Sequence, residues 1–241
     1  MRELLYLVLF IPILLESCDR PKQKEKVKTQ RSEEIIGVDI SHFQGDIEWQ
    51  KVNKKQIHFV IIKSTEGGDW RDPNFKLNWK GAREAGFVTG AYHVFTKRNG
   101  EKQANFYSSI VPKTKGCIRP CVDLISRKHV LLNWGDTIIT ELKAFNTVIK
   151  KKFGVLPIIY ATKDILDHIK FKQHFKNPIW IQQYHPSNPE HSIKQSYVLW
   201  QYTISGNKKY HELYKNSRSD KRVDLDRFNG DYNDLKKILL N

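Results

Sequence analysis

The sequence of 241 residues has little glycine and proline, no long apolar run, and few acidic residues relative to basic ones. With thirteen glycines and nine prolines, it is neither a collagen nor a low-complexity polymer, and its hydrophobic content of 39% excludes a wholly disordered chain. Its longest apolar run, residues 4–15, is too short to cross a bilayer as a helix. Acidic residues are scarce beside basic ones, 26 against 41, so the formal net charge is +15. A chain this basic suits an anionic partner such as nucleic acid, anionic lipid or cell-wall polymer.

The N-terminal 34 residues differ in composition from the rest. Residues 4–15 have the length of the hydrophobic segment of a signal peptide, and the motif Leu15-Glu16-Ser17-Cys18 that follows resembles a bacterial lipobox. Residues 19–34 are rich in Lys and Gln and read as a flexible tether. We predict a signal peptide over 1–17 and a lipidated Cys18 with its tether over 18–34. The protein would then be exported and lipid-anchored in a bacterial envelope, in the periplasm or at the cell surface. A plain secretory signal or a short membrane anchor is the alternative.

The sequence has three cysteines, and only Cys117 and Cys121 follow the tether. Four residues along an extended strand span roughly 13 Å, too far for a disulfide, although a bend at Gly116 would shorten the distance. We expect two free thiols. No second pair of Cys or His side chains has the spacing of metal ligands, so neither a metal site nor a cofactor is expected.

From residue 35 onward, eight short β-rich runs alternate with helical segments. The runs are 35–40, 58–63, 87–95, 118–125, 155–161, 178–184, 197–203 and 222–225. Helices are predicted over 46–55, 74–85, 101–110, 134–153 and 163–169. This alternation favours an α/β protein built from βα units around a largely parallel sheet. We predict a single, somewhat irregular (β/α) barrel of the TIM type over 35–241, with an open doubly wound sheet as the alternative.

Functional groups in such a barrel lie at the C-terminal ends of the strands. Polar and aromatic side chains gather at the predicted strand ends. They are Asp39, Ser41, Lys63, Thr65, Glu66, Tyr92, His93, Asp123, Tyr160, Thr162, Gln182, Tyr184, Trp200, Gln201, Asp224 and Asp226. One polar residue at a strand end is ordinary, but a series of eight such ends indicates a shared site.

Seven stretches of the sequence resemble those of glycoside hydrolase family 25, the lysozymes (N-acetylmuramidases) that cleave peptidoglycan glycan strands. In family order they are GVDISHFQ (37–44), FVIIKSTEG (59–67), GAYHVF (90–95), PIIYAT (157–162), WIQQY (180–184), LWQY (199–202) and VDLD (223–226). The resemblance implies an irregular β/α barrel with a groove at the strand C-termini. It also implies hydrolysis of β-1,4 bonds between N-acetylmuramic acid and N-acetylglucosamine.

The resemblance implies roles for individual residues as well. Asp39, Asp123 and Asp224 match the family's groove-floor carboxylates and are the expected catalytic residues. The expected sugar-binding residues are Tyr92, Tyr160, Tyr184, Trp200 and Gln201. In the family's scheme the substrate acetamide acts as an internal nucleophile, one Asp orients it, and a Glu protonates the leaving oxygen.

Two strand ends depart from the family pattern. The fourth strand normally ends Asp-x-Glu, but here Ile125 takes the place of the acidic Glu. Side chains alternate along a strand, so we expect Ile125 to project into the groove beside Asp123, where it cannot donate a proton. The last strand carries Asp226 where the family has Asn. Asp226 and Glu66 are candidate substitute acids, because neighbouring carboxylates raise one another's pKa.

Four side chains also have simpler interpretations. We expect His93 to be packed or hydrogen-bonded in the core rather than to act as a base. Lys63 and Glu66 are expected to form an ion pair at the barrel mouth, and His42 is a candidate ligand contact.

Three functions remain open. They are a muramidase whose activity is in doubt, a pseudoenzyme that binds cell-wall glycan without cutting it, and a basic nucleic-acid-binding module. The last is least favoured, because the basic residues are spread along the chain and form no nucleic-acid motif. We therefore expect peptidoglycan strands as partner, a membrane through Cys18, no nucleic acid, and a monomer.

Overall fold

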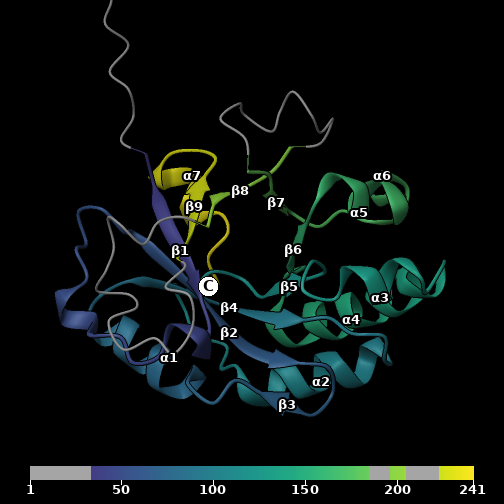
Figure 1. The fold of residues 1–241 in the computed structure, drawn as a ribbon, viewed down its shortest axis with the longest axis horizontal. Helices are drawn as coiled ribbons and strands as arrows, with labels where there is room; N and C mark the ends of the chain where they lie inside the picture. The colour runs from purple at the N-terminus through teal and green to yellow at the C-terminus, as the bar shows by residue number, and fades with distance from the viewer. Residues whose placement is uncertain (1–33, 185–195, 205–222) are drawn as a thin grey trace, which may run out of the picture. The chain divides into compact units, whose positions relative to one another are not determined.

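The computed structural model describes residues 34–184, 196–204 and 223–241, all within the unit Ser32–Asn241 (Figure 1). The predicted signal peptide, Cys18 and most of the tether lie outside these residues. In the described ranges no helix has both the length and the apolar character needed to span a bilayer.

A sheet of nine strands forms the centre of the described fold. The strands are β1 (Ile36–Ile40), β2 (Phe59–Glu66), β3 (Trp70–Arg71), β4 (Val88–Val94), β5 (Cys121–Asp123), β6 (Ile158–Ala161), β7 (Ile179–Gln182), β8 (Leu199–Thr203) and β9 (Asp224–Phe228). All except β3 form a closed ring, because β1 pairs with β2 on one side and with β9 on the other. The predicted α/β barrel is confirmed and the open sheet is wrong. The unpredicted β3 is a two-residue hairpin partner of β2, too short to leave a pattern in the sequence.

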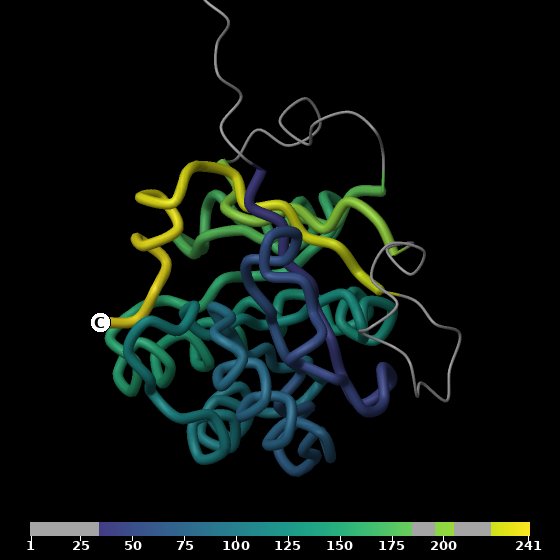
Figure 2. The backbone as a smooth tube through the Cα atoms, turned by 90° about the vertical axis from the view of Figure 1, so that its left-hand side faces the viewer, coloured from purple at the N-terminus to yellow at the C-terminus, as the bar shows by residue number. Residues whose placement is uncertain are grey.

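One strand of the ring runs against the others. The neighbouring strands from β1 to β8 around the ring are parallel, whereas β9 is antiparallel to both β1 and β8. Figure 2 shows the purple N-terminal strand beside the yellow C-terminal segment. The prediction that Asp224 and Asp226 end a parallel strand is wrong. Asp224 begins β9 opposite Asp39, and Asp226 lies two residues deeper, opposite Gly37. Residue patterns carry no information about strand direction, which is why the sequence did not show this.

Helices cover the outside of the barrel (Figure 1). They are α1 (Phe75–Glu84), α2 (Gly100–Ile110), α3 (Lys128–Leu132), α4 (Thr137–Phe153), α5 (Lys163–His168), α6 (Phe171–His174) and α7 (Tyr232–Lys236). The predicted helix over 46–55 is wrong, since this segment has only one short 3₁₀ turn, Trp49–Lys51, and a second 3₁₀ turn, His42–Gln44, precedes it. Ser41 and Gln44 form a capping box around the first turn.

Side-chain alternation divides the apolar residues of the strands between two cores. The inner core fills the barrel with Phe59, Ile61, Cys121, Ile158, Trp180, Leu199 and Phe228. The outer core lies between strands and helices and includes Val60, Ile62, Val122, Phe145, Ile159 and Ile181. Leu235 and Ile238 of the C-terminal segment extend the inner core, and that segment pairs with residues 116–119 through backbone hydrogen bonds. Cys117 and Cys121 are buried free thiols, as predicted.

Candidate active site

A cavity of about 450 Å³ lies at the mouth of the barrel, where the inner wall changes from apolar to polar. Its predicted lining residues are Asp39, Tyr92, Asp123, Ile125, Tyr160, Tyr184, Gln201 and Asp224. Gln182, expected at a strand end, lines it as well, and so do Ser126 and Phe43, to which sequence reasoning assigned no role. We call it the acidic cavity, because its lining among the described residues contains three carboxylates and no Lys, Arg or His.

The turn after β5 holds Asp123 and presents Ile125. Asp123 Oδ1 accepts hydrogen bonds from the backbone N–H of Ile125 (2.6 Å) and Ser126 (3.0 Å), while Oδ2 accepts one from Ser126 Oγ (2.5 Å). Burial raises the pKa of Asp123, and these hydrogen bonds act in the opposite direction. Ile125 lies beyond the strand end and still lines the cavity, so a turn places it there rather than strand alternation.

Gln201 connects the opposite wall of the cavity. Its Nε2 donates to Asp39 Oδ2 (2.7 Å), and its Oε1 accepts from the phenols of Tyr160 (2.5 Å) and Tyr184 (2.6 Å). Gln182 Nε2 lies 2.9 Å from the Tyr160 oxygen and 2.8 Å from the Tyr184 oxygen. This network fixes two aromatic rings and one carboxylate in a single wall, which a ligand would meet already ordered.

Beneath this wall lies a pair of carboxyls, Asp39 and Asp226. Trp180 Nε1 donates to Asp226 Oδ1 (2.7 Å), but the buried Asp226 Oδ2 has no hydrogen-bond partner among the described residues. Burial, followed by the negative charges of Asp224 and Asp226, raises the pKa of Asp39 well above its usual value. Burial and Asp224 raise the pKa of Asp226 in the same way. In both groups, burial and the neighbouring negative charge favour the protonated form over the charged one.

The sequence and the fold were compared with known proteins. The model of glycosyl hydrolases family 25 matches residues 38–211. This chain belongs to glycosyl hydrolases family 25. A family 25 glycosyl hydrolase from Bacillus anthracis has the same fold with a TM-score of 0.75, at 30% identity over 88% of this chain and 95% of that one.

Two curated relatives of this family 25 chain are bacterial. YegX of Escherichia coli K12, an uncharacterized protein, is 27% identical over 194 residues, which cover 78% of this chain and 70% of YegX. The autolytic lysozyme of Clostridium acetobutylicum is 29% identical over 173 residues, 70% of this chain and 51% of that protein. The predicted membership of the lysozyme and muramidase family is thereby confirmed.

Trp200 does not line the cavity of this family 25 barrel, contrary to prediction. Its neighbours Leu199 and Gln201 face the barrel interior, so alternation turns Trp200 outward into the outer core. The side chain is 5% exposed, and its Nε1 donates to the Gln183 carbonyl oxygen (2.8 Å). The adjacency of Trp200 and Gln201 already excluded an inward position for both.

Neither candidate substitute acid lines the acidic cavity. Asp226 is fully buried rather than exposed at a strand end. Glu66 forms the predicted ion pair with Lys63 (2.9 Å) and also pairs with Arg127. Partial burial acts to raise the pKa of Glu66, but the hydrogen bonds from Lys63 and Arg127 outweigh it and lower the pKa. Glu66 is therefore ionised at neutral pH and has no proton to donate.

His93 is packed, as predicted. Its ring stacks on Phe145, and its Nδ1 lies 2.8 Å from Thr65 Oγ1. Burial lowers the pKa of His93 to about 4, so the ring is neutral at physiological pH. His93 stacks on Phe145 of α4 and is not among the residues that line the acidic cavity.

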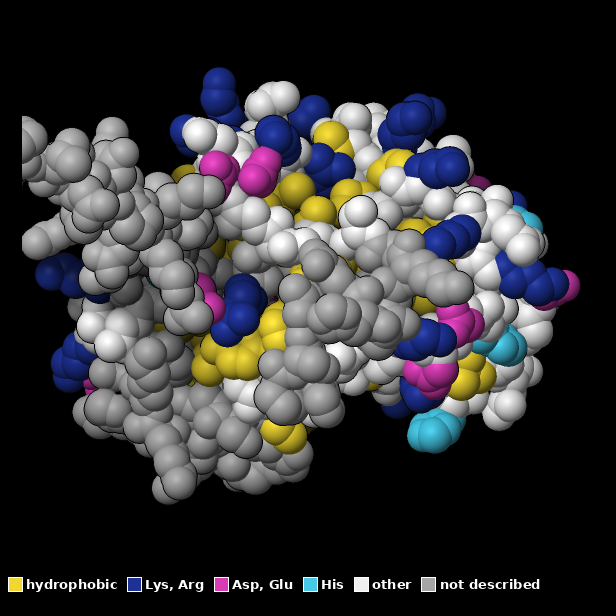
Figure 3. Space-filling model, turned by 90° about the horizontal axis from the view of Figure 1, so that it is seen from above, with side chains coloured by type: hydrophobic (Ala, Val, Ile, Leu, Met, Phe, Trp, Pro, Cys, Tyr) yellow, Lys and Arg dark blue, Asp and Glu magenta, His cyan; other side chains and the backbone are white. Residues whose placement is uncertain are grey.

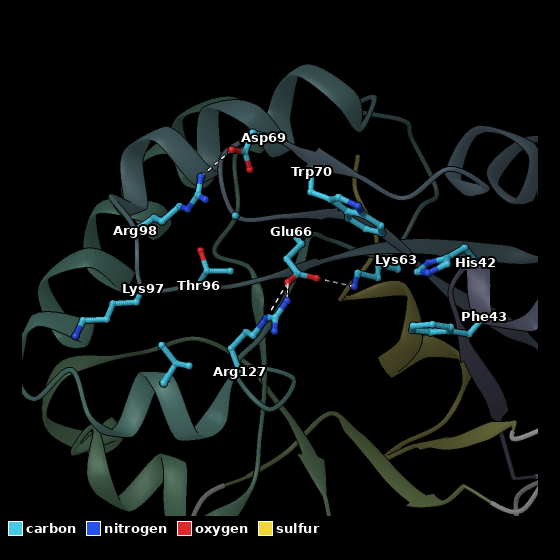
Figure 4. Close-up of a pocket in the computed structure, with 12 residues that line it drawn as sticks. His42, Phe43, Lys63, Glu66, Asp69, Trp70, Thr96, Lys97, Arg98 and Arg127 are labelled. Carbon is cyan, nitrogen blue, oxygen red and sulfur yellow. Dashed lines mark hydrogen bonds and ion pairs between the residues drawn. The ribbon is translucent and has the colours of Figure 1, made fainter. Parts of the chain in front are cut away.

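A second cavity of about 620 Å³ shares Phe43 with the acidic cavity (Figure 4). It is lined by His42, Phe43, Lys63, Glu66, Gly67, Asp69, Trp70, Thr96, Lys97, Arg98, Arg127 and Val130. We call it the basic cavity, because four Lys and Arg side chains line it against two carboxylates. Sequence reasoning missed it, since its residues come from four separate segments, 42–43, 63–70, 96–98 and 127–130. In the described ranges, no group of His, Cys, Asp or Glu is arranged to hold a metal ion.

Proposed function

We propose that this protein binds peptidoglycan glycan strands in the acidic cavity and cleaves them slowly or not at all. The observation that carries the proposal is the position of Ile125, which lines the cavity two residues after Asp123. By family resemblance this is the position of the general acid. Loss of a positioned acid lowers a hydrolysis rate roughly 10²- to 10⁴-fold.

The lining of the acidic cavity supports glycan binding. Sugar rings are uncharged, have apolar faces, and carry hydroxyl and acetamide groups that both donate and accept hydrogen bonds. Tyr92, Tyr160 and Tyr184 provide aromatic surface, and Gln182 and Gln201 provide amides. A few fixed polar groups among aromatic rings are typical of a small-molecule site.

The hydrogen bonding of Asp123 supports slow chemistry. Both carboxylate oxygens already accept hydrogen bonds from the turn that follows, so Asp123 is held as an acceptor. A carboxylate in this state can orient a substrate acetamide, which is the family role of an Asp in this groove. It does not replace the missing proton donor.

A second candidate function is hydrolysis with Asp39 as the acid. Asp39 lines the cavity, and its raised pKa favours the protonated form that a general acid requires. Asp226 is too deeply buried to touch a glycan and would act through Asp39 by sharing its proton. This alternative requires that the proton face the leaving oxygen of the bound glycan.

A muramidase assay separates the two candidates. The unit Ser32–Asn241 and its Ile125→Glu, Ile125→Gln and Asp39→Asn variants are compared on purified peptidoglycan. We expect the parent to be weakly lytic at most, Ile125→Glu to gain several orders of magnitude, and Ile125→Gln to gain nothing. A parent that cuts rapidly and loses this rate in Asp39→Asn supports the second candidate and overturns the first.

Export and lipidation are further parts of the proposal. They rest on residues 1–18 of the sequence, with a tether from Cys18 to residue 34 and the barrel over 35–241. The net charge of +15 suits an anionic envelope surface. Fatty-acid labelling of the full chain, lost in Cys18→Ala, tests the anchor, and sedimentation of Ser32–Asn241 tests the proposed monomer.

The nucleic-acid alternative gains no support from the described residues on the face drawn in Figure 3. Figure 3 shows Lys and Arg side chains spread over several parts of the visible face rather than gathered in one band. A phosphate backbone is normally bound by such a band or stripe of basic residues. Retention on DNA at physiological salt would reverse this judgement.

A further inference from the structure

The basic cavity differs from the acidic cavity in charge, although both open at the same end of the barrel. Lys63, Lys97, Arg98 and Arg127 line the basic cavity, whereas none of the described residues that line the acidic cavity is cationic. A ligand with one neutral part and one anionic part would therefore have a defined orientation across the two cavities.

Arg127 and Lys63 meet at Glu66 in the centre of the basic cavity (Figure 4). Both Nε and Nη2 of Arg127 donate to Glu66 Oε1, and Lys63 Nζ donates to Glu66 Oε2 (2.9 Å). Arg127 Nη1 makes no hydrogen bond to a described residue, and about half of the Arg127 side chain is exposed. One carboxylate thus holds two cations in place and leaves donors directed at solvent.

Other cations extend this basic surface. Arg98 Nη1 pairs with Asp69 (2.8 Å) on the far side of the cavity, leaving the rest of its guanidinium exposed. Lys97 beside it forms no ion pair with a described residue. The positive charge of the cavity therefore exceeds what its own carboxylates neutralise.

Exposed apolar side chains form the remaining walls. Phe43 is 56% exposed, Val130 47% and Trp70 37%. His42 packs between Phe43 and Trp70, and Lys63 Nζ lies 4.7 Å from the centre of the Trp70 ring. Because Phe43 also lines the acidic cavity, the apolar surface is continuous from one cavity to the other.

We propose that the basic cavity binds the acidic peptide stem of a glycan strand whose sugars occupy the acidic cavity. A peptide stem carries free carboxylates on a short chain with apolar side chains, which matches fixed cations between Trp70, Phe43 and Val130. The carboxylates of the acidic cavity would repel the stem, and the basic cavity would attract it. This inference rests on the proposed function, since the glycan places the stem.

Binding of three ligands to the unit Ser32–Asn241 tests this inference. The ligands are a neutral chitooligosaccharide, a muropeptide of similar sugar length with its acidic stem, and the free stem peptide. The test variant is the double substitution Lys97→Gln with Arg127→Gln. Lys151→Gln with Lys152→Gln is the charge-matched control, because these exposed residues end α4, near the start of β6 and away from the mouth.

We expect the parent to bind the muropeptide more tightly than the chitooligosaccharide. The ratio of these two affinities should fall roughly tenfold in the test variant and stay unchanged in the control variant. Raising the salt concentration should weaken muropeptide binding more than chitooligosaccharide binding. Thermal unfolding of each variant separates a folding defect from a lost contact.

The remaining outcomes separate the inference from the proposed function. If both glycans bind and the preference is unchanged in the test variant, the inference is wrong and the proposed function stands. If neither glycan binds the parent, the proposed function is wrong. Binding of the free stem peptide then tests whether the basic cavity takes an acidic peptide. If the parent then binds the free stem peptide in a salt-sensitive way and the test variant does not, the inference stands. If the parent does not bind the peptide, the inference is overturned.

Discussion

Asp224 lies directly opposite Asp39 where the antiparallel strand β9 meets β1 at the barrel mouth. Only the reversed direction of β9 places its first residue at this level. Both carboxyls line the acidic cavity, and the charge of Asp224 is the largest electrostatic contribution to the raised pKa of Asp39, after burial. The charge state of the cavity floor therefore depends on the direction of one strand.

Replacing Asp226 with Asn should stabilise the protein at neutral pH. An Asn side chain can still accept the Trp180 hydrogen bond, and its amide can donate to Asp39. The pKa of Asp226 is raised in the folded state, so the folded state binds more protons than the unfolded one, and stability falls as pH rises above about 4. Asp226→Asn removes this loss.

Urea unfolding at pH 4.5 and pH 7.5 measures this effect. We expect Asp226→Asn to exceed the parent by about 1 kcal/mol or more at pH 7.5, with a smaller difference at pH 4.5, since one pKa unit corresponds to about 1.4 kcal/mol. Asp231→Asn, at the exposed N-cap of α7, is the control for the same change of side chain outside the barrel interior. A parent as stable as the variant at both pH values would show that Asp226 is not held neutral.

Removing the hydroxyl of Ser126 should weaken the turn that presents Ile125. Ser126→Ala deletes the donor to Asp123 Oδ2 and leaves the two backbone donors to Oδ1. We expect a loss of about 1 kcal/mol of unfolding free energy at pH 7 and a further rise in the pKa of Asp123. Chemical denaturation with carboxyl NMR titration measures both, and a pKa unchanged from the parent would contradict the geometry.

Substituting Trp200 should affect stability more than ligand binding. The side chain is buried in the outer core, so Trp200→Ala should cost about 3–5 kcal/mol. Trp200→Phe keeps most of the packing and should leave glycan affinity within about twofold of the parent. Tyr184→Ala is the opposite case, because this half-exposed ring lines the cavity. A large loss of glycan affinity in Trp200→Phe, measured by calorimetric titration, would show that Trp200 contributes to the site after all.

Gly100 should tolerate no side chain. A Cβ at this position would lie 1.8 Å from the Glu141 carbonyl oxygen, where α2 crosses α4. We expect Gly100→Ala to lower the unfolding free energy by about 2 kcal/mol or more, because the backbone of α4 must move. Gly68→Ala, with nothing within 4 Å of the added carbon, should change it by less than about 0.5 kcal/mol. Equal melting temperatures for the two variants would contradict the close packing.

Local patterns in the sequence were sufficient to predict most strands and helices of the barrel. The runs that became β1, β2 and β4 and the helices α1, α2 and α4 were predicted within a few residues. The segment 46–55 was mispredicted because its apolar residues fit a helical spacing but form only one turn beneath α1. There Trp49 lies so close to Gly81 that an added Cβ would be 2.3 Å from its ring.

A site residue was predictable where its position in a strand fixes whether its side chain points into the barrel or out of it. Asp39 and Gln201 followed this rule, and the same rule, had it been applied, would have excluded Trp200. Contacts between distant segments were not predictable. The pairing of Glu66 with Arg127 joins residues 61 positions apart and leaves no periodic signal. The basic cavity, which depends on such contacts, therefore emerged only from the folded chain.

Because β9 fills the space between β1 and β8, the ring is closed by the strand that is synthesised after all its other members. Until Val223 and the residues after it arrive, the first and eighth strands each present an unsatisfied edge. A chain truncated before β9 loses more than the helix α7. It leaves the cylinder split along its length, with Asp39 deprived of both Asp224 and Asp226.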